Sequence, residues 1–129
     1  MSSTLSLLPD DNHFISLEKA KEMTALYNSE KNAVLKPEFQ GQNILSVCET
    51  FDRSAFDTLL AETGCAGIRV YFGMTPALKV RAIIVGVDQD NKDILPPAGS
   101  AGGGSASSGD GVIVEEGRPC PDFCPIPLL

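Results

Sequence analysis

The chain has 129 residues, of which 43% are hydrophobic, so it is long and apolar enough to bury one core. Its 17 acidic and 10 basic residues give a net charge of -7, which repels nucleic-acid phosphates and anionic membrane surfaces. No apolar run approaches about 18 residues, and residues 1–11 lack the basic and apolar regions of a signal peptide. We therefore expect an acidic cytoplasmic protein of one domain, 1–129, that binds neither nucleic acid nor a membrane.

Helical spacing begins after an N-terminal arm, residues 1–15. The hydroxyl of Ser16 can accept a hydrogen bond from an amide of the first turn. The helix dipole also favours the negative charge of Glu18 in that turn. Apolar residues then recur on one face, which predicts a helix over 16–31. That face consists of Leu17, Ala20, Met23, Thr24 and Tyr27.

A second helix is predicted after a cap at Thr50 or Asp52, and it ends at Gly64 in a C′ position. Its apolar stripe consists of Ala55, Phe56, Leu59 and Leu60.

The clearest strands are 67–74 and 78–88, which are rich in β-branched and aromatic residues. Closed by a three-residue loop at 75–77, they form a hairpin in which Tyr71 lies opposite Arg81. A one-residue slip would mix the two faces, so the pattern favours this register. Shorter strands are expected at 44–48, 92–95 and 112–116, with a turn at 88–91.

The sequence therefore predicts an α+β fold: two helices packed on a small, mostly antiparallel sheet built around a central hairpin. The Gly/Ser-rich stretch 96–111 has no side chains with which to build a core, and we expect a flexible surface loop within the domain. The Pro/Cys-rich tail, 117–129, is expected to be irregular.

Cys120 and Cys124, two of the four cysteines, lie close together in this proline-rich tail. They could form a disulfide, which would be easily reduced because so small a loop is strained. Alternatively, they could supply two thiolates to Zn²⁺. Cys48 and Cys65 could complete a zinc site, although the spacing is not that of a zinc finger. The alternative is that the tail thiols pack the tail onto the body, and that Cys48 and Cys65 pack in the core.

Arg69, Tyr71 and Arg81 are the candidate ligand-binding residues. Two guanidinium groups and a phenol on rigid strands could bind a carboxylate or phosphate. The alternative is a solvated face with one cross-strand cation–π pair.

Nothing in the sequence pairs a nucleophile with a base. His13, the single histidine, lies on the arm and is expected at the surface. Residues 88–93 approach an EF-hand loop but have Lys92 and Asp93 where that loop needs a ligand and a glycine. These observations favour a protein that is not an enzyme.

Three segments resemble a family of small uncharacterised bacterial proteins of unknown function: residues 64–74, residues 78–88 and Arg118-Pro119-Cys120-Pro121. The resemblance covers most of the chain outside the arm and the Gly/Ser loop. It implies a bacterial cytosolic protein and transfers no catalytic or binding residue.

The function predicted from these patterns is a non-catalytic module that binds a small anionic ligand or a protein partner. The alternative is a thiol-redox or zinc-binding protein that uses the C-terminal cysteine pair. Apolar residues of the tail could also dock on a partner or make an oligomer: Phe123, Ile126, Leu128 and Leu129.

Overall fold

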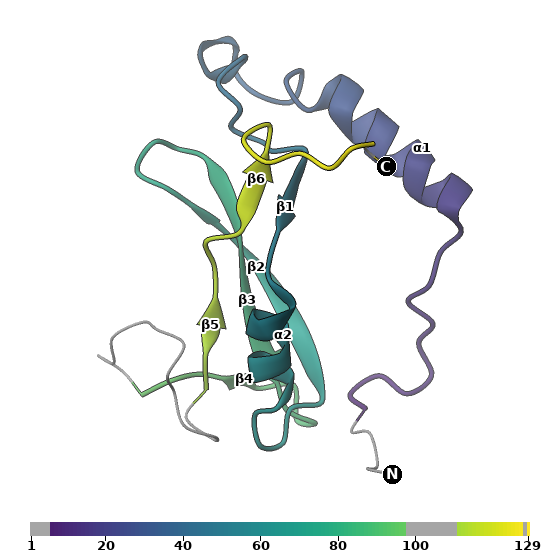
Figure 1. The fold of residues 1–129 in the computed structure, drawn as a ribbon, viewed down its shortest axis with the longest axis vertical. Helices are drawn as coiled ribbons and strands as arrows, with labels where there is room; N and C mark the ends of the chain where they lie inside the picture. The colour runs from purple at the N-terminus through teal and green to yellow at the C-terminus, as the bar shows by residue number, and fades with distance from the viewer. Residues whose placement is uncertain (1–5, 98–110, 128) are drawn as a thin grey trace. The chain divides into compact units, whose positions relative to one another are not determined.

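The computed structural model describes residues 6–97, 111–127 and 129, and it confirms the α+β prediction (Figure 1). No described helix has the length and apolarity needed to cross a bilayer. The predicted loop 96–111 lies almost wholly outside the described residues. The elements are α1 (Leu17–Glu30), a 3-10 helix (Pro37–Phe39), β1 (Cys48–Thr50), α2 (Arg53–Leu60), β2 (Gly67–Met74), β3 (Val80–Val87), β4 (Asp93–Ile94), β5 (Ile113–Val114) and β6 (Arg118–Cys120).

The contacts gather these elements into two compact units, each described by itself. The first unit contains Phe51–Gly73, Arg81–Gly117 and the start of the chain. The second contains Asp11–Thr50, Met74–Val80 and Arg118–Leu129. The single-domain hypothesis stays a prediction, and the strands divide between two antiparallel sheets instead of forming one.

In the four-stranded sheet, β3 pairs with β2, β4 and β5. β4 and β5 follow one another along β3, because Ile94 pairs with Gly86 and Ile113 pairs with the next residue, Val85. Both pairings are antiparallel. The chain therefore leaves the edge of β3 after β4 and resumes it with β5.

The core of the first unit forms where α2 packs on β5. Leu59 is 0% exposed and packs with Ile84, Val112 and Val114. Leu60 was predicted in the same stripe but is 55% exposed. Consecutive helical residues point about 100° apart, so one of the two must leave the core face. The partly buried residues around this core are Phe51, Ala55, Phe56 and Cys65.

The ends of α2 differ in detail from the prediction. Asp52 is the N-cap by backbone conformation, but its side chain makes no capping hydrogen bond. The helix ends at Leu60 with Ala61 as its C-cap, so Gly64 is not the C′ residue. Gly64 has φ +79° and belongs to the turn that leads into β2, a conformation that suits glycine.

Helix α1, in the second unit, confirms the predicted helix to within one residue at each end. Ser16 is its N-cap, and its hydroxyl accepts the Lys19 N–H at 3.0 Å. None of its residues is buried, but the phenol of Tyr27 donates to the carbonyl of Ser46 at 2.7 Å.

The second unit also holds the two-stranded sheet of β1 and β6, which lie side by side in Figure 1. The prediction that the whole tail is irregular was therefore wrong for Arg118–Cys120. Pro119 has no N–H to donate, but a two-stranded ladder has free edges that tolerate proline. The strand predicted at 44–48 begins only at Cys48, while Ile44 is buried and its carbonyl accepts the Val80 N–H at 2.9 Å.

The hairpin loop lies one residue later than predicted. The Thr75 N–H donates to the Lys79 carbonyl at 2.9 Å, and the Leu78 N–H donates to the Thr75 carbonyl at 2.7 Å. Leu78 takes the left-handed conformation, with φ +66°. Because the loop moves by one residue on both strands, side chains keep their predicted faces while their partners across the hairpin change.

Candidate functional site

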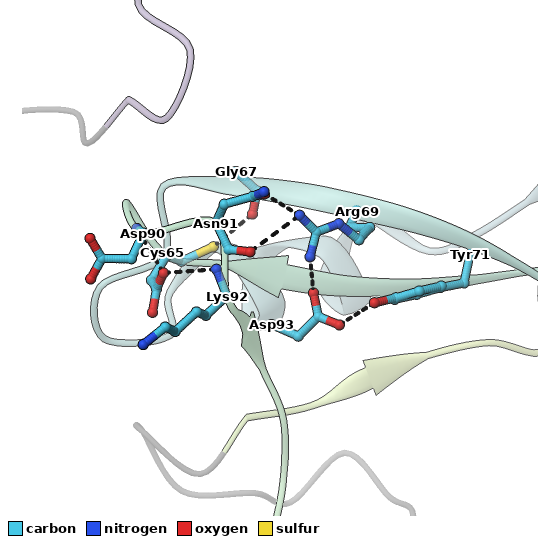
Figure 2. A network of polar contacts seen from close by, with 9 residues as sticks. Cys65, Gly67, Arg69, Tyr71, Asp90, Asn91, Lys92 and Asp93 are labelled. Atoms are coloured by element: carbon cyan, nitrogen blue, oxygen red, sulfur yellow. Dashed lines mark hydrogen bonds and ion pairs between the residues drawn. The ribbon is translucent and has the colours of Figure 1, made fainter.

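The side chains of Arg69 and Tyr71 on β2 converge on the carboxylate of Asp93 (Figure 2). Arg69 Nη1 donates to Asp93 Oδ1 and forms an ion pair with it, while the Tyr71 hydroxyl donates to Oδ2. Arg69 Nη2 donates to the side-chain oxygen of Asn91 and, at 3.4 Å, to its carbonyl. The carboxylate of Asp93 thus binds two of the three predicted anion-binding side chains.

The turn before β4 holds Asp93 in place. The side chain of Asp88 accepts the N–H groups of Asp90 and Lys92 at 2.9 and 3.0 Å. Asn91 takes the left-handed conformation, with φ +65°, which asparagine tolerates better than most residues. The predicted turn at 88–91 is confirmed, and the pairing of Val87 with Asp93 then fixes the carboxylate relative to the hairpin.

The network sets the protonation of its donors. Desolvation lowers the pKa of Arg69, but the hydrogen bond and the charge of Asp93 raise it, and the net shift is upward. The hydrogen bond to Asp93, followed by desolvation, raises the pKa of Tyr71 above its usual value, although the charge of Arg69 opposes this. At neutral pH both side chains therefore remain proton donors to the carboxylate.

This geometry bears on the predicted anion site. An anionic ligand of Arg69 and Tyr71 would have to displace the carboxylate of Asp93, which is already bound in the chain. Arg81, the third candidate residue, lies half-buried on β3. The anion-site hypothesis stays a prediction.

The opposite face of β2 is apolar and open. Ile68, Val70 and Phe72 occupy alternate positions of the strand, so their side chains share one face. They are 44%, 44% and 80% exposed. We call these three residues the β2 apolar face.

The cysteines of the tail are joined. Cys120 and Cys124 form a disulfide whose Cα atoms lie 4.7 Å apart. Cys48, on β1, is a free thiol directly opposite Cys120 in the ladder. Cys65 is also free, and it packs against the core of the first unit as predicted, with its thiol 3.3 Å from the carbonyl of Gly67.

One further candidate residue, His13, stands apart from these groups. His13 is exposed, as expected. Within residues 6–97, 111–127 and 129, no group of three or more His, Cys, Asp and Glu side chains is placed to hold a metal ion.

Sequence reasoning missed Asp93 and Asn91 as partners of the β2 side chains. It also considered Cys48 as a core residue or as a further member of a thiol or metal site, but did not place it opposite Cys120. The turn at 88–91 was a usable signal for Asp93, because a residue that follows a hairpin turn returns beside the hairpin. Comparison with protein-family models, curated proteins and solved structures gives no match to this chain.

Proposed function

We propose that this chain is a non-catalytic protein-interaction module that binds an extended segment of a partner protein along β2. The observation that carries the proposal is the β2 apolar face, whose three side chains are 44–80% exposed on an eight-residue strand.

An added strand would use both the backbone and the side chains of β2. Among the described strands, β2 pairs only with β3, so its other edge offers N–H and C=O groups to a new strand. A long apolar edge strand invites pairing unless it is protected by charge, proline or a cover. The alternating face supplies side-chain contacts, and an aromatic residue such as Phe72 contributes a large buried area.

The opposite face of β2 supports the same proposal. Arg69 and Tyr71 are bound to Asp93, which ties the strand to β4 and holds it extended. A strand that is ordered before binding loses less conformational entropy when the partner arrives.

Charge restricts the partner. The chain has a net charge of -7, so association is faster with a neutral or basic segment than with an acidic one. The partner segment is therefore expected to alternate apolar residues with uncharged or basic ones.

Selection of short random peptides on the immobilised full-length protein tests the proposal. We expect alternating apolar peptides whose affinity falls about tenfold or more, about 1.4 kcal/mol, with Phe72→Ser. In the complex, backbone amides of β2 should exchange more slowly with solvent.

Ile113→Ser is the matched control, because Ile113 is 50% exposed on β5, away from the β2 apolar face. Peptides that bind both variants equally, or that protect other amides, would refute the proposal. Concentration-dependent dimerisation that Phe72→Ser abolishes would instead assign the face to a second copy of the chain.

A thiol-redox role is the second candidate function, and the Cys120–Cys124 disulfide favours it over a zinc site. A disulfide-bonded cysteine has no thiolate to donate to a metal, since the thiolate is the ligand form. Peptide mapping under non-reducing conditions tests this candidate, and it fails if no Cys120–Cys124 link is found.

A further inference from the structure

We infer that Cys48 is the thiol with which the Cys120–Cys124 disulfide exchanges, so that the bond can move from the tail loop onto the β1–β6 ladder. The inference rests on the second candidate function, the thiol-redox role, and is independent of the β2 apolar face.

The ladder places Cys48 directly opposite Cys120. β1 and β6 are antiparallel, with Cys48 opposite Cys120 and Thr50 opposite Arg118, and the Val47 N–H donates to the Cys120 carbonyl at 3.1 Å. Opposite residues have Cβ atoms about 4.5–5.5 Å apart on one face, whereas a disulfide needs about 3.5–4.5 Å. A small closing of the ladder therefore suffices for a Cys48–Cys120 bond.

Burial makes Cys48 the best-placed attacking thiol for Cys120. Cys120 is 2% exposed, whereas Cys124 is exposed. A thiol from solvent therefore reaches Cys124 first, and Cys120 is reached from the neighbouring strand. Cys65, the other free thiol, packs against the core formed by Leu59, Ile84, Val112 and Val114.

The exchange step needs no oxidant or reductant. The Cys48 thiol gives its proton to solvent, and the thiolate attacks Cys120 Sγ. The Cys48–Cys120 bond forms as the Cys120–Cys124 bond breaks, and the electron pair leaves on Cys124. Cys124 then takes a proton from solvent, so the reaction is an isomerisation between two disulfides.

The two disulfide forms differ in which segments the disulfide joins. In the first, the tail loop is also held by the Phe123 N–H, which donates to the Pro119 carbonyl at 2.7 Å, and by the Arg118 guanidinium, 5.4 Å from the Phe123 ring centroid. In the second, a covalent bond joins β1 to β6 and Cys124 is a free, exposed thiol. The longer loop closed by Cys48–Cys120 also restricts the unfolded chain more.

The test is a disulfide map of the full-length chain after incubation with a catalytic amount of glutathione, acid quenching and alkylation. We expect two species: Cys120–Cys124 with Cys48 alkylated, and Cys48–Cys120 with Cys124 alkylated. Cys124→Ser, treated with oxidised glutathione, should close Cys48–Cys120, with loss of the two thiol hydrogens.

Cys65→Ser is the matched control and should give the wild-type map, whereas Cys48→Ser should give only Cys120–Cys124. The inference is overturned if Cys48 is alkylated in every wild-type molecule and Cys124→Ser yields only mixed disulfides with glutathione. In that case a Cys120–Cys124 link would leave the second candidate function standing. The absence of any disulfide in the wild-type chain would refute both.

Discussion

Among the described glycines, Gly111 is the one at which an added Cβ atom would collide with backbone atoms. It has φ +76°, and a Cβ atom there would lie 2.5 Å from the carbonyl carbon of Leu95 and 2.7 Å from its oxygen. Backbone atoms on the neighbouring segment cannot move aside as a side chain can. The Gly111 N–H also donates to the carboxylate of Glu62, a buried residue, at 3.1 Å.

Gly111→Ala should therefore lower the free energy of unfolding by about 2 kcal/mol or more, since it combines a left-handed backbone with a steric clash. Gly67→Ala is the control, because a Cβ there would meet Val87 Cγ2 at 3.4 Å, an ordinary contact. Its effect should stay within about 1 kcal/mol. Urea unfolding measures both, and equal losses would contradict the steric argument.

At the scale of elements, β3 organises the first unit by pairing with β4 and then β5. Ile94 and Ile113 pair with consecutive residues of β3, so the segment between them begins and ends at nearly the same place. The close approach of Gly111 to Leu95 is the consequence. Helix α2 contacts β5 beyond this junction and buries Leu59.

Leu59→Ala should lower the free energy of unfolding by about 2–5 kcal/mol, because it leaves a cavity in a closed core. Leu60→Ala is the control on the same helix, because Leu60 is 55% exposed and alanine is a better helix former. Its effect should be within about 0.5 kcal/mol. Similar losses for the two variants in urea unfolding would mean that α2 does not present Leu59 alone to the sheet.

The elements that the sequence predicted well are those with a local physical signal. The cap at Ser16 and the helical period gave α1, and the run of β-branched residues gave β2 and β3. β6 was missed because two prolines surround Cys120 and no period marks a three-residue strand. The turn at 88–91 could have placed Asp93 beside Arg69, but it does not show which side chains meet, and no local signal places Cys48 opposite Cys120.

At the scale of the molecule, each unit contains one of the chain's two tyrosines. In the first unit the Tyr71 hydroxyl donates to Asp93, and in the second the Tyr27 hydroxyl donates to the Ser46 carbonyl. The hydrogen bond to Asp93, with desolvation, raises the pKa of Tyr71, and burial raises the pKa of Tyr27. In both units the phenol must keep its proton for the hydrogen bond to exist.

These shifts set the sign of an alkaline effect on stability. A phenol whose pKa is higher in the folded chain binds its proton more tightly there than in the unfolded chain. Its contribution is therefore complete below about pH 10, the value for unfolded tyrosine, and is lost as the pH rises through the folded value. The free energy of unfolding should thus fall above about pH 10, in addition to any change from lysine side chains.

Urea unfolding of the wild type, Tyr71→Phe and Tyr27→Phe between about pH 8 and pH 11 separates the two contributions. Each variant should be less stable than the wild type at neutral pH but should lose less stability on alkalinisation, because it lacks one titrating phenol. Lysine effects are common to all three proteins and cancel in the comparison. If Tyr71→Phe follows the wild-type pH dependence, the phenol does not donate to Asp93 in solution. The Asp93 carboxylate would then be bound by the side chain of Arg69 alone. An anionic ligand would have to compete only with Asp93 for the guanidinium, with no phenol hydrogen bond to replace.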